Sequence, residues 1–442
     1  GFDQRAIWFA VVATGAAAAV SGLLPVLRGG RTEPAVSLRG ATRTATGKQH
    51  VLRDALVVAQ VALALVLVCG SGLLVRSVVA LQNADSGFDA DGVVVAPIFL
   101  DAQAYPSGEA SRIYYDTLFE TLRALPGVAA VGGATTLPTS PLGPDFDRPV
   151  WPDGGRQEDA IPAAVRMLTP GHLDAMGMRL TEGRGFDGRD HPEAPPVVMV
   201  SARLASQLWP GQPAAGQQVR IDYSTRGVGA FEVVGVVDDV RFRGPRSEPR
   251  AEIYIPHAQN SYLIMHVAVR GDGDPRALIP GVQAALREVD PLKPAYGIQL
   301  LSELVAATTV RDRQAMFTLL AFAAATVFLA MLGVDGVLSA RVRERRREIG
   351  IRMALGADRR QLLSWVAASG ARLLLLGSVL GLVAALLLSG LMSGLLYGVT
   401  PTDPVTLVAT LVVLFAIGVA AMALPSWRAT RVDPVRVLRS DP

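Results

Sequence analysis

The sequence contains very little cysteine and histidine, and its charged residues are sparse. Of its 442 residues, one is cysteine, five are histidine and 18% are charged. Because Cys69 is the single cysteine, no disulfide can form within the chain. The histidines have no i, i+4 pair that would place two metal ligands on one helix face; they are His50, His172, His191, His257 and His266. The sequence therefore predicts neither a disulfide framework nor a histidine metal site.

Motifs for nucleotide binding and catalysis are also missing. A P-loop needs G-x-x-x-x-G-K-[ST], whose amides cradle phosphates and whose hydroxyl binds Mg²⁺. The nearest stretch, GATRTATGKQ at residues 40–49, has the wrong glycine spacing and a glutamine after the lysine. No serine lies in a G-x-S-x-G elbow. We therefore expect no enzyme activity and no cofactor in this chain, and an enzyme held by membrane anchors is the least favoured function.

Long apolar segments are abundant instead, since half of the residues are hydrophobic. Five windows contain no charged residue: 7–27, 55–75, 314–334, 373–396 and 404–427. Each has the roughly 20 residues that a helix needs to cross about 30 Å of hydrocarbon. A soluble helix seldom stays uncharged for so long, because one face normally meets water. The sequence predicts five membrane helices.

The distribution of arginine and lysine predicts the orientation of these helices. Basic residues cluster in segments 28–53, 341–360 and 428–439, whereas the short loop 392–404 has none. The positive-inside rule places the basic segments in the cytoplasm and that loop outside. The long insert, residues 82–313, is then extracytoplasmic. The net charge of +3 is small, so the expected partner is the lipid bilayer and not nucleic acid.

The long insert has the composition of a folded α+β domain. Short runs rich in β-branched residues are bounded by Gly, Pro and Asp; they cover residues 93–100, 195–201, 231–237, 251–256 and 263–270. Apolar residues recur at helical spacing in 111–125 and 275–289. Because strands and helices do not alternate as in βαβ units, the pattern favours an α+β fold.

The two ends of the chain resemble each other. LPVLRGGRTEPAVSLR at 24–39 and LPSWRATRVDPVRVLR at 424–439 align without a gap, with proline, leucine and arginine at the same positions. This spacing favours an internal duplication. The sequence has no initiator methionine. We therefore expect residues 1–39 to be the last span and tail of a preceding half, and the chain to be the later part of a duplicated protein.

Several motifs resemble those of one family. They are REIGIRMALGA (347–357), VVAQVALALVLVCGSGLLVRS (57–77), WPGQPAAGQQVR (209–220), VVGVVDDVR (233–241) with EIYIPHAQ (252–259), and YGVTPTDP (397–404). With them, the whole chain is similar to FtsX/MacB-type permeases of ATP-binding-cassette (ABC) systems, and most closely to their duplicated ADOP, or orphan-permease, branch.

The resemblance implies a membrane protein with an α-helical bundle of five spans and a large α+β extracytoplasmic domain of the MacB periplasmic core type. The expected segments are a last helix of a preceding half (1–28), a basic cytoplasmic linker (29–53), membrane helices (54–80, 312–340, 367–397 and 404–427), the extracytoplasmic domain (81–311), a cytoplasmic amphipathic elbow (341–366), a short external loop (398–403) and a basic tail (428–442). An FtsX-like permease domain would cover 312–435.

The resemblance also implies a function. The chain would be a permease subunit of an ABC-type export or mechanotransmission system in the bacterial cytoplasmic membrane, coupling a separate cytoplasmic ATPase to a periplasmic domain that acts on an envelope or exported substrate. ATP would enter only through that subunit. Other expected partners are the missing N-terminal half or a second permease copy, and a periplasmic or outer-membrane protein. The alternative is a signalling scaffold that regulates an envelope enzyme without transport.

Two sets of residues are candidate sites. The elbow is the expected ATPase-docking surface, because lipid binding alone would need only Lys or Arg and not an ordered apolar ridge; it comprises Glu348, Ile349, Gly350, Ile351, Arg352, Met353, Ala354, Leu355, Gly356 and Ala357. The second set contains small residues expected to allow close packing of membrane helices: Gly377, Gly381, Gly390 and Gly394.

Acidic residues at two places leave alternatives open. Asp238 and Asp239 follow a predicted strand and could bind a cation, although a solvated turn is favoured because a hard cation needs several converging oxygens. Asp335 stands where the family usually has tyrosine, near the end of an apolar window. Its carboxylate could reach the interface, the favoured reading, or take part in proton coupling.

Overall fold

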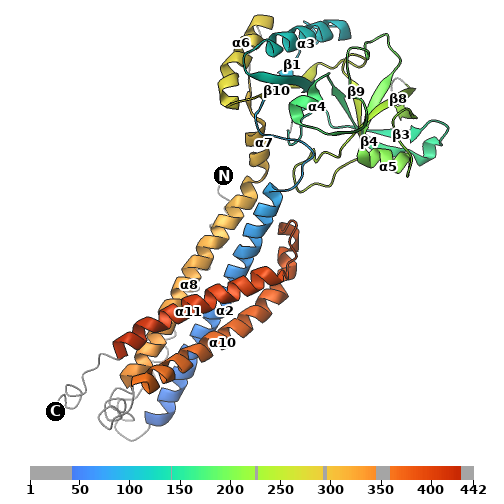
Figure 1. Cartoon of the computed structure of the whole chain (residues 1–442). Helices are drawn as coiled ribbons and strands as arrows, with labels where there is room; N and C mark the ends of the chain where they lie inside the picture. Colours follow the sequence, from blue (N-terminus) through green and yellow to red (C-terminus); the bar gives the residue numbers. More distant parts are fainter. Residues whose placement is uncertain (1–41, 141, 224–226, 292–295, 345–358, 430–442) are drawn as a thin grey trace. The chain divides into compact units, whose positions relative to one another are not determined.

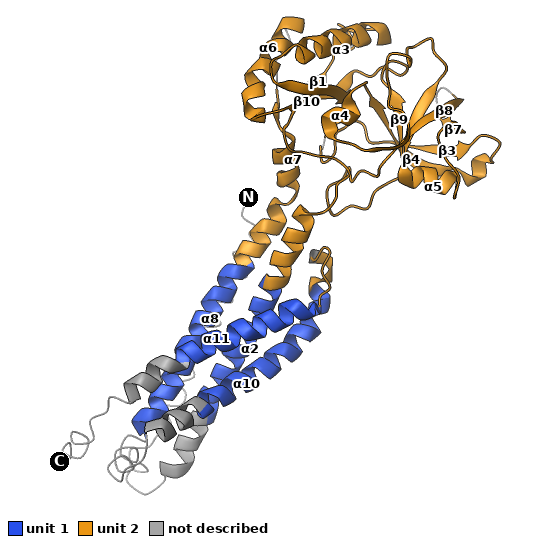
Figure 2. Ribbon diagram, viewed as in Figure 1, with its two compact units in different colours: residues 1–71, 319–391, 402–442 blue, residues 72–318, 392–401 orange. Residues whose placement is uncertain are grey.

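The computed structural model describes residues 42–140, 142–223, 227–291, 296–344 and 359–429. The chain divides into two compact units (Figure 2), which are described separately. The first comprises residues 1–71, 319–391 and 402–442, and the second comprises 72–318 and 392–401. The predicted span at 7–27 lies outside the described residues.

Four long helices carry the remaining predicted spans: α2 (Thr42–Gln82), α8 (Val310–Glu344), α10 (Arg359–Met392) and α11 (Pro404–Ala429). Within the described part of the chain, four helices are long and apolar enough to cross a membrane. In the first unit they share a core that includes Val61, Val334 and Leu374. Other large apolar side chains of the same helices are exposed, such as Leu387 at 78%. An apolar outer surface of this kind suits contact with lipid.

The second unit is built on one mixed sheet of eleven strands, counted over the described residues. The strands are β1 (Val93–Phe99), β2 (Val128–Ala134), β3 (Asp147–Pro152), β4 (Ile161–Leu168), β5 (Leu180–Gly183), β6 (Val197–Ser201), β7 (Gln218–Asp222), β8 (Val228–Val237), β9 (Glu252–Pro256), β10 (Ile264–Gly271) and β11 (Gln299–Leu300). The shorter helices of this unit are α3 (Gly108–Arg123), α4 (His172–Met176), α5 (Ala202–Leu208), α6 (Ile279–Val289) and α7 (Leu301–Thr308), with 3₁₀ turns at Gln157–Asp159, Pro275–Leu278 and Ser393–Leu395.

The sheet divides into two lobes. Strands β11, β1, β10 and β2 pair in that order and form the sheet lobe, on which α3 and α6 lie (Figure 1). Strands β4, β3, β7, β8, β6 and β9 pair in that order, and β9 pairs back with β4, so that they close into a ring, the barrel lobe. Only one residue pair, Ala134 with Leu168, joins β2 to β4. Few ladder pairs therefore join the lobes, but buried side chains of both, such as Val95, Met199 and Ala268, share one hydrophobic core.

The residue pattern explains the core within each lobe. Alternate residues of β4, such as Val165 and Met167, point into the ring with Ile253 of β9, as the two-residue period of a strand requires. On α3, Tyr115, Leu118 and other buried residues face β1 and β10. Ser107 caps this helix by accepting a hydrogen bond from the N–H of Ala110 at 3.1 Å.

The α+β fold of the insert is confirmed, and the five strand predictions match β1, β6, β8, β9 and β10 apart from their ends. The helical pattern predicted over 275–289 is confirmed by α6, and a 3₁₀ turn occupies its first four residues. Strands β2, β3, β4, β5, β7 and β11 were missed. Gly, Ala and Pro interrupt several of them, so they lack the β-branched composition that marks a strand.

Candidate functional site

The candidate site lies within the second unit, close to the end of α2 and the start of α8, which both belong to that unit. The chain enters this unit through the end of α2 and leaves it through α7 and the start of α8. Between β8 and β9, residues 238–251 form a connection that we call the junction loop. This loop contacts both the segment after α2 and the start of α8, as the following contacts show.

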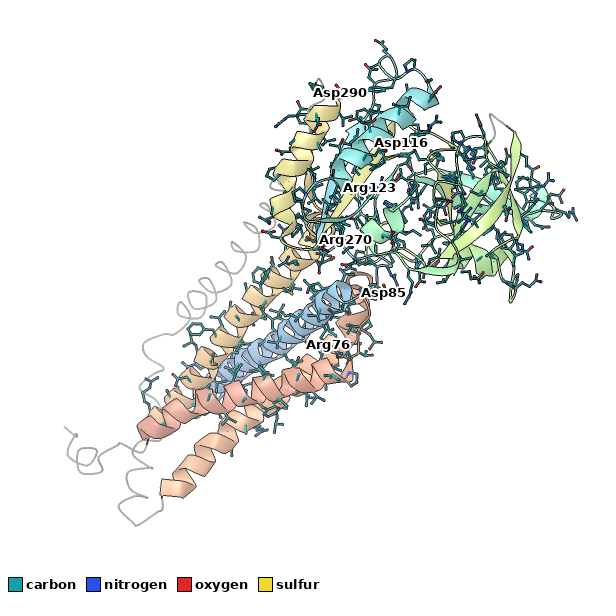
Figure 3. All side chains as sticks on the ribbon, turned by 45° about the horizontal axis from the view of Figure 1, so that its top comes forward. Arg76, Asp85, Asp116, Arg123, Arg270 and Asp290 are labelled. Carbon is teal, nitrogen blue, oxygen red and sulfur yellow. The ribbon has the colours of Figure 1, made fainter. Side chains whose placement is uncertain are left out.

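The junction loop holds the segment after α2 by donating hydrogen bonds to the backbone carbonyls of that segment. The N–H of Arg241 donates to the carbonyl of Ser86 at 3.0 Å, and its Nε donates to the carbonyl of Asp85 at 3.0 Å; Figure 3 labels Asp85 beside the end of α2. Gly87 has φ +76°, and a Cβ there would overlap the carbonyl oxygen of Asp239. Glycine is required at this close approach, since a side chain would be both strained and blocked.

The same loop holds the start of α8 through an ion pair. The guanidinium of Arg246 donates to Asp312 twice, with Nη2–Oδ1 at 2.8 Å and Nε–Oδ2 at 3.3 Å. Such bidentate geometry is the strong form of an arginine–carboxylate pair. Nearby, Gly244 has φ +100° and lies 3.9 Å, measured from an added Cβ, from the Thr308 side chain at the end of α7. The junction loop therefore contacts both the segment after α2 and the segment from the end of α7 to the start of α8.

The inner side of the junction loop is anchored on the barrel lobe. The carbonyl of Phe242 accepts from the N–H of Thr139 at 2.7 Å, and Thr139 has a positive φ of 63°. This conformation is uncommon for a threonine and persists only where the surroundings hold it. The guanidinium of Arg166 lies 3.8 Å from the centre of the Phe242 ring, and Arg243 donates to Asp145 at 2.9 Å.

Arg166 also forms a buried ion pair between β4 and β9. Its Nε and Nη2 donate to the two carboxylate oxygens of Glu252 at 3.1 and 3.2 Å, and the side chains are only 2% and 1% exposed. The hydroxyl of Tyr254 donates to Glu252 at 3.1 Å. Burial raises the pKa of Glu252 to about 6, against the lowering effect of Arg166. The pair must be kept intact, because one partner left alone would be an uncompensated buried charge.

These contacts make the junction loop a mechanical connection. A displacement of the segment after α2, or of the start of α8, strains hydrogen bonds that lead to the Phe242 ring. That ring in turn packs on the Arg166–Glu252 pair, which joins two strands of the barrel lobe. The junction loop is therefore continuous, through packed and hydrogen-bonded side chains, with the core of the barrel lobe.

The structure gives partners to both carboxylates of the Asp238–Asp239 pair. Asp238 accepts from Nε of Arg179 at 3.1 Å, and this hydrogen bond lowers the pKa of Asp238. Asp239 accepts from the backbone N–H of Arg203 in α5 at 2.8 Å. In the part of the chain that the structure describes, no cluster of three or more His, Cys, Asp or Glu has the arrangement of a metal site. The two carboxylates thus serve ion pairing and helix capping.

Two of the four singled-out glycines lie against another membrane helix. A Cβ added at Gly377 would approach the Val61 side chain of α2 to 2.6 Å. At Gly381 it would approach the backbone of Ala62 to 2.8 Å. A Cβ added at Gly390 or Gly394 would meet no atom within 4 Å. Close approach of α10 to α2 is therefore concentrated at the first glycine pair.

Charged and polar side chains also lie among the membrane helices. Arg341 of α8 pairs with Asp54 of α2. Asp335 lies inside α8, which continues to Glu344. Its Oδ1 is buried and has no hydrogen-bond partner among the described residues. Arg341 therefore compensates the charge of Asp54.

The predicted docking elbow, Glu348–Ala357, lies outside the described residues. Sequence reasoning missed Arg246, Asp312, Arg166 and Glu252 as functional candidates. The motif VVGVVDDVR leads directly into the junction loop, so the sequence could have indicated where this loop begins. The sequence could not have indicated the pairing of Arg246 with Asp312, because the two residues are 66 positions apart and belong to no short motif.

Two family models match this chain. A family model described as MacB-like periplasmic core domain matches residues 55–289, and one described as FtsX-like permease C-terminal matches residues 320–434. Among solved structures, the periplasmic region of MacB from Actinobacillus actinomycetemcomitans matches with a TM-score of 0.35 and 13% identity, covering 51% of this chain and 95% of that one.

Curated relatives are ABC transporter permeases. The uncharacterized ABC transporter permease YvrN of Bacillus subtilis (strain 168) is 28% identical over 286 residues, which cover 61% of this chain and 68% of YvrN. The macrolide export ATP-binding/permease protein MacB of Syntrophobacter fumaroxidans is 25% identical over 346 residues, covering 63% of this chain and 47% of MacB. The pyoverdine export ATP-binding/permease protein PvdT of Pseudomonas putida is 25% identical, covering 59% and 40%. The chain thus spans less than half of MacB and PvdT.

Proposed function

Because this chain belongs to the family of ABC transporter permeases with a MacB-like periplasmic core domain and an FtsX-like C-terminal domain, we propose that it transmits motion. In this proposal a separate cytoplasmic ATPase moves the membrane helices, and the second unit, outside the cytoplasm, changes shape and acts on an exported or envelope substrate. The protein would lie in a bacterial cytoplasmic membrane. The chain itself would bind no nucleotide, since no P-loop is present in its sequence.

The observation that carries this proposal is the double attachment of the junction loop. Arg241 holds the carbonyls that follow α2, and Arg246 holds Asp312 at the start of α8. A loop fastened to only one helix would follow that helix passively. A loop attached at both places is displaced when the two attachment points move relative to each other. In this proposal Phe242, which packs on Arg166, carries that displacement to the ring of strands.

The ATPase would dock on the elbow formed by Glu348–Ala357. Its sequence EIGIRMALGA alternates apolar and small residues between basic ones, as a ridge that enters a groove of a partner protein does. The neighbouring arginines would meet anionic lipid. The two interactions can be separated by substitution.

The experiment compares two double variants of the full-length protein. Ile351→Asp with Leu355→Asp places carboxylates in the apolar ridge and is expected to abolish co-purification of an ABC-type ATPase from membranes. Arg345→Gln with Arg346→Gln removes positive charge beside the ridge and should leave that co-purification intact. Retention of the ATPase by the first variant, or its loss only in the second, would reject the docking surface.

A further inference from the structure

A cavity of about 790 Å³ opens in the second unit where the two lobes face each other. The sheet lobe contributes residues 99–102 at the end of β1 and residues 260–264 at the start of β10. The barrel lobe contributes side chains of β3 and β4 and of the residue that follows β7. The volume lies within the range of about 300–1,000 Å³ that is typical of small-molecule sites, which often form between domains.

Aromatic rings are concentrated around this cavity. Phe99, Phe146, Tyr223 and Tyr262 all line it, although only 6% of the chain is aromatic. The Phe99 side chain is 49% exposed, while the Tyr223 ring is supported by Phe231 at 6.1 Å. Phe146, Tyr223 and Tyr262 are partly buried against the barrel core, so one exposed ring and three partly open rings line the cavity. Aromatic lining of this kind is typical of small-molecule sites.

The lining of the cavity carries one charge of each sign, on opposite walls. Among the described lining residues Arg148 is the single cation, and its guanidinium lies 5.1 Å from the centre of the Phe146 ring. The carboxylate of Asp101 on the opposite wall accepts from the N–H of Gln103 at 2.9 Å and so closes a turn. The barrel-lobe wall therefore offers a positive charge beside an aromatic face.

The sheet-lobe wall is held in place by His257. The Nε2 atom of His257 accepts a hydrogen bond from the N–H of Tyr262 at 3.1 Å. The backbone carbonyl of His257 accepts one from the hydroxyl of Ser261 at 3.2 Å. The imidazole is 3% exposed and meets the Tyr115 ring edge-on at 5.2 Å. The wall is thus shaped before any ligand arrives, which reduces the entropy that binding would cost.

We propose that this cavity binds a drug-sized amphipathic acid. Its aromatic or aliphatic body would lie between Phe99, Phe146 and Tyr223, and its carboxylate or other anionic group would pair with Arg148, as guanidinium groups do. The proposal names a ligand class for the permease function proposed above, and its role in transport rests on that function. Binding itself requires neither ATP nor an ATPase, so the two proposals can fail separately.

The test uses the full-length protein in lipid nanodiscs with 4-benzoylbenzoate, a photoreactive aromatic acid, as the probe. After irradiation, mass spectrometry of the digested protein should find saturable adducts on peptides that contain residues 99–102, 223 or 260–264. The neutral methyl ester of the probe should label these peptides about tenfold less, because a charge-assisted hydrogen bond is lost.

Three variants complete the test. Arg148→Gln should reduce labelling by the acid about tenfold, whereas Arg156→Gln, a matched change at an exposed arginine of the same unit, should leave labelling unchanged. Ala102→Trp, at an exposed position on the cavity wall, should block labelling by filling space. Melting curves check that each variant is folded.

Two outcomes would overturn the proposal. Adducts spread over the surface of the protein, or labelling that is equal in Arg148→Gln and in the unsubstituted chain, would show that the cavity does not select the anionic group. Displacement of the probe by an apolar peptide with an amidated C-terminus, which lacks an anionic group, would assign the cavity to a peptide instead.

Discussion

The buried pair of Arg166 and Glu252 shows at the residue scale how charge is used inside the barrel lobe. Each side chain is almost fully buried, and their attraction only offsets the loss of hydration. Tyr254 satisfies a further lone pair of the carboxylate. The pair is therefore more important for holding β4 and β9 in one arrangement than for net stability.

This reading predicts an asymmetric mutational response. Arg166→Met leaves the Glu252 carboxylate without its partner and should lower the free energy of unfolding by about 3–5 kcal/mol. Arg166→Met with Glu252→Gln should recover most of that loss, because no buried charge remains. Denaturant unfolding of the detergent-solubilised protein, followed by hydrogen exchange of β4 and β9 peptides, measures both. Equal destabilisation of the single and double variants would contradict the argument.

Three buried histidines make the second unit sensitive to acid. Burial lowers the pKa of His172 to about 3 and of His257 to about 4, and it lowers that of His266 as well. An unfolded histidine titrates near 6.5, so the stabilisation is present above that pH and is lost as the pH falls toward the folded values. Glu252 acts in the opposite direction, because its pKa is raised in the folded state. Its contribution to the stability of this unit is fully present below its unfolded pKa of 4.5 and is lost as the pH rises through about 6.

Stability of this unit should therefore decrease as the pH falls from about 6.5 to 5, with a slope of about 1.4 kcal/mol per pH unit for each extra proton that the unfolded state binds. His172→Gln should reduce that slope by the contribution of about one proton, because one fewer histidine is protonated on unfolding. His191→Gln, a change at an exposed histidine, is the control and should leave the slope unchanged. The opposite trend, with stability rising toward pH 5, would show that Glu252 outweighs the histidines.

At the scale of elements, the approach of α10 to α2 depends on two glycines. Gly381→Leu places a side chain against the backbone of Ala62 and should force the helices apart, at a cost typical of overpacking, about 1–3 kcal/mol. Gly390→Leu is the matched control on the same helix, because an added Cβ meets no atom within 4 Å. Thermal aggregation and size-exclusion profiles in detergent measure the difference. Equal behaviour of both variants would show that the glycines are not packing positions.

Prediction from sequence succeeded where one physical signal dominates an element. Uncharged windows gave the locations of the long apolar helices, and β-branched runs gave strands such as β6 and β9, all of whose residues are buried. It failed for β2, with sequence VAAVGGA, and for β3, with sequence DRPVWP. Their strand conformation is imposed by neighbouring strands and not by their own residues.

The candidate site was predictable only in part, for the same reason. The motif VVGVVDDVR directed attention to the end of β8, yet its aspartates cap α5 and pair with Arg179 and do not gather at a metal. Arg246 and Asp312 meet because the fold returns the chain to its point of entry. Such tertiary pairs leave no local periodicity or motif in the sequence.

At the scale of the whole molecule, a polypeptide that passes through a membrane and carries a large insert between two spans must connect both ends of that insert to the helices. In this chain the junction loop holds the segment after α2 and the start of α8, and Arg270 also holds Asp89 in the segment after α2. The two lobes share one ladder pair between β2 and β4, a buried hydrophobic core, and a cavity. In the function proposed above, these lobes move relative to each other when the helices move.

The most direct measurement is the distance between the lobes in the presence and absence of ATP. Spin labels at Ile113→Cys on α3 and Gln207→Cys on α5, in a Cys69→Ser background, report that distance by pulsed electron resonance in native nanodiscs that retain the ATPase. We predict a distance distribution that shifts with ATP and Mg²⁺, no shift in Asp312→Asn, and recovery of the shift when Arg246→Asp is combined with Asp312→Arg. A distribution that ignores ATP, or a shift that persists unchanged in Asp312→Asn, would contradict transmission through the junction loop.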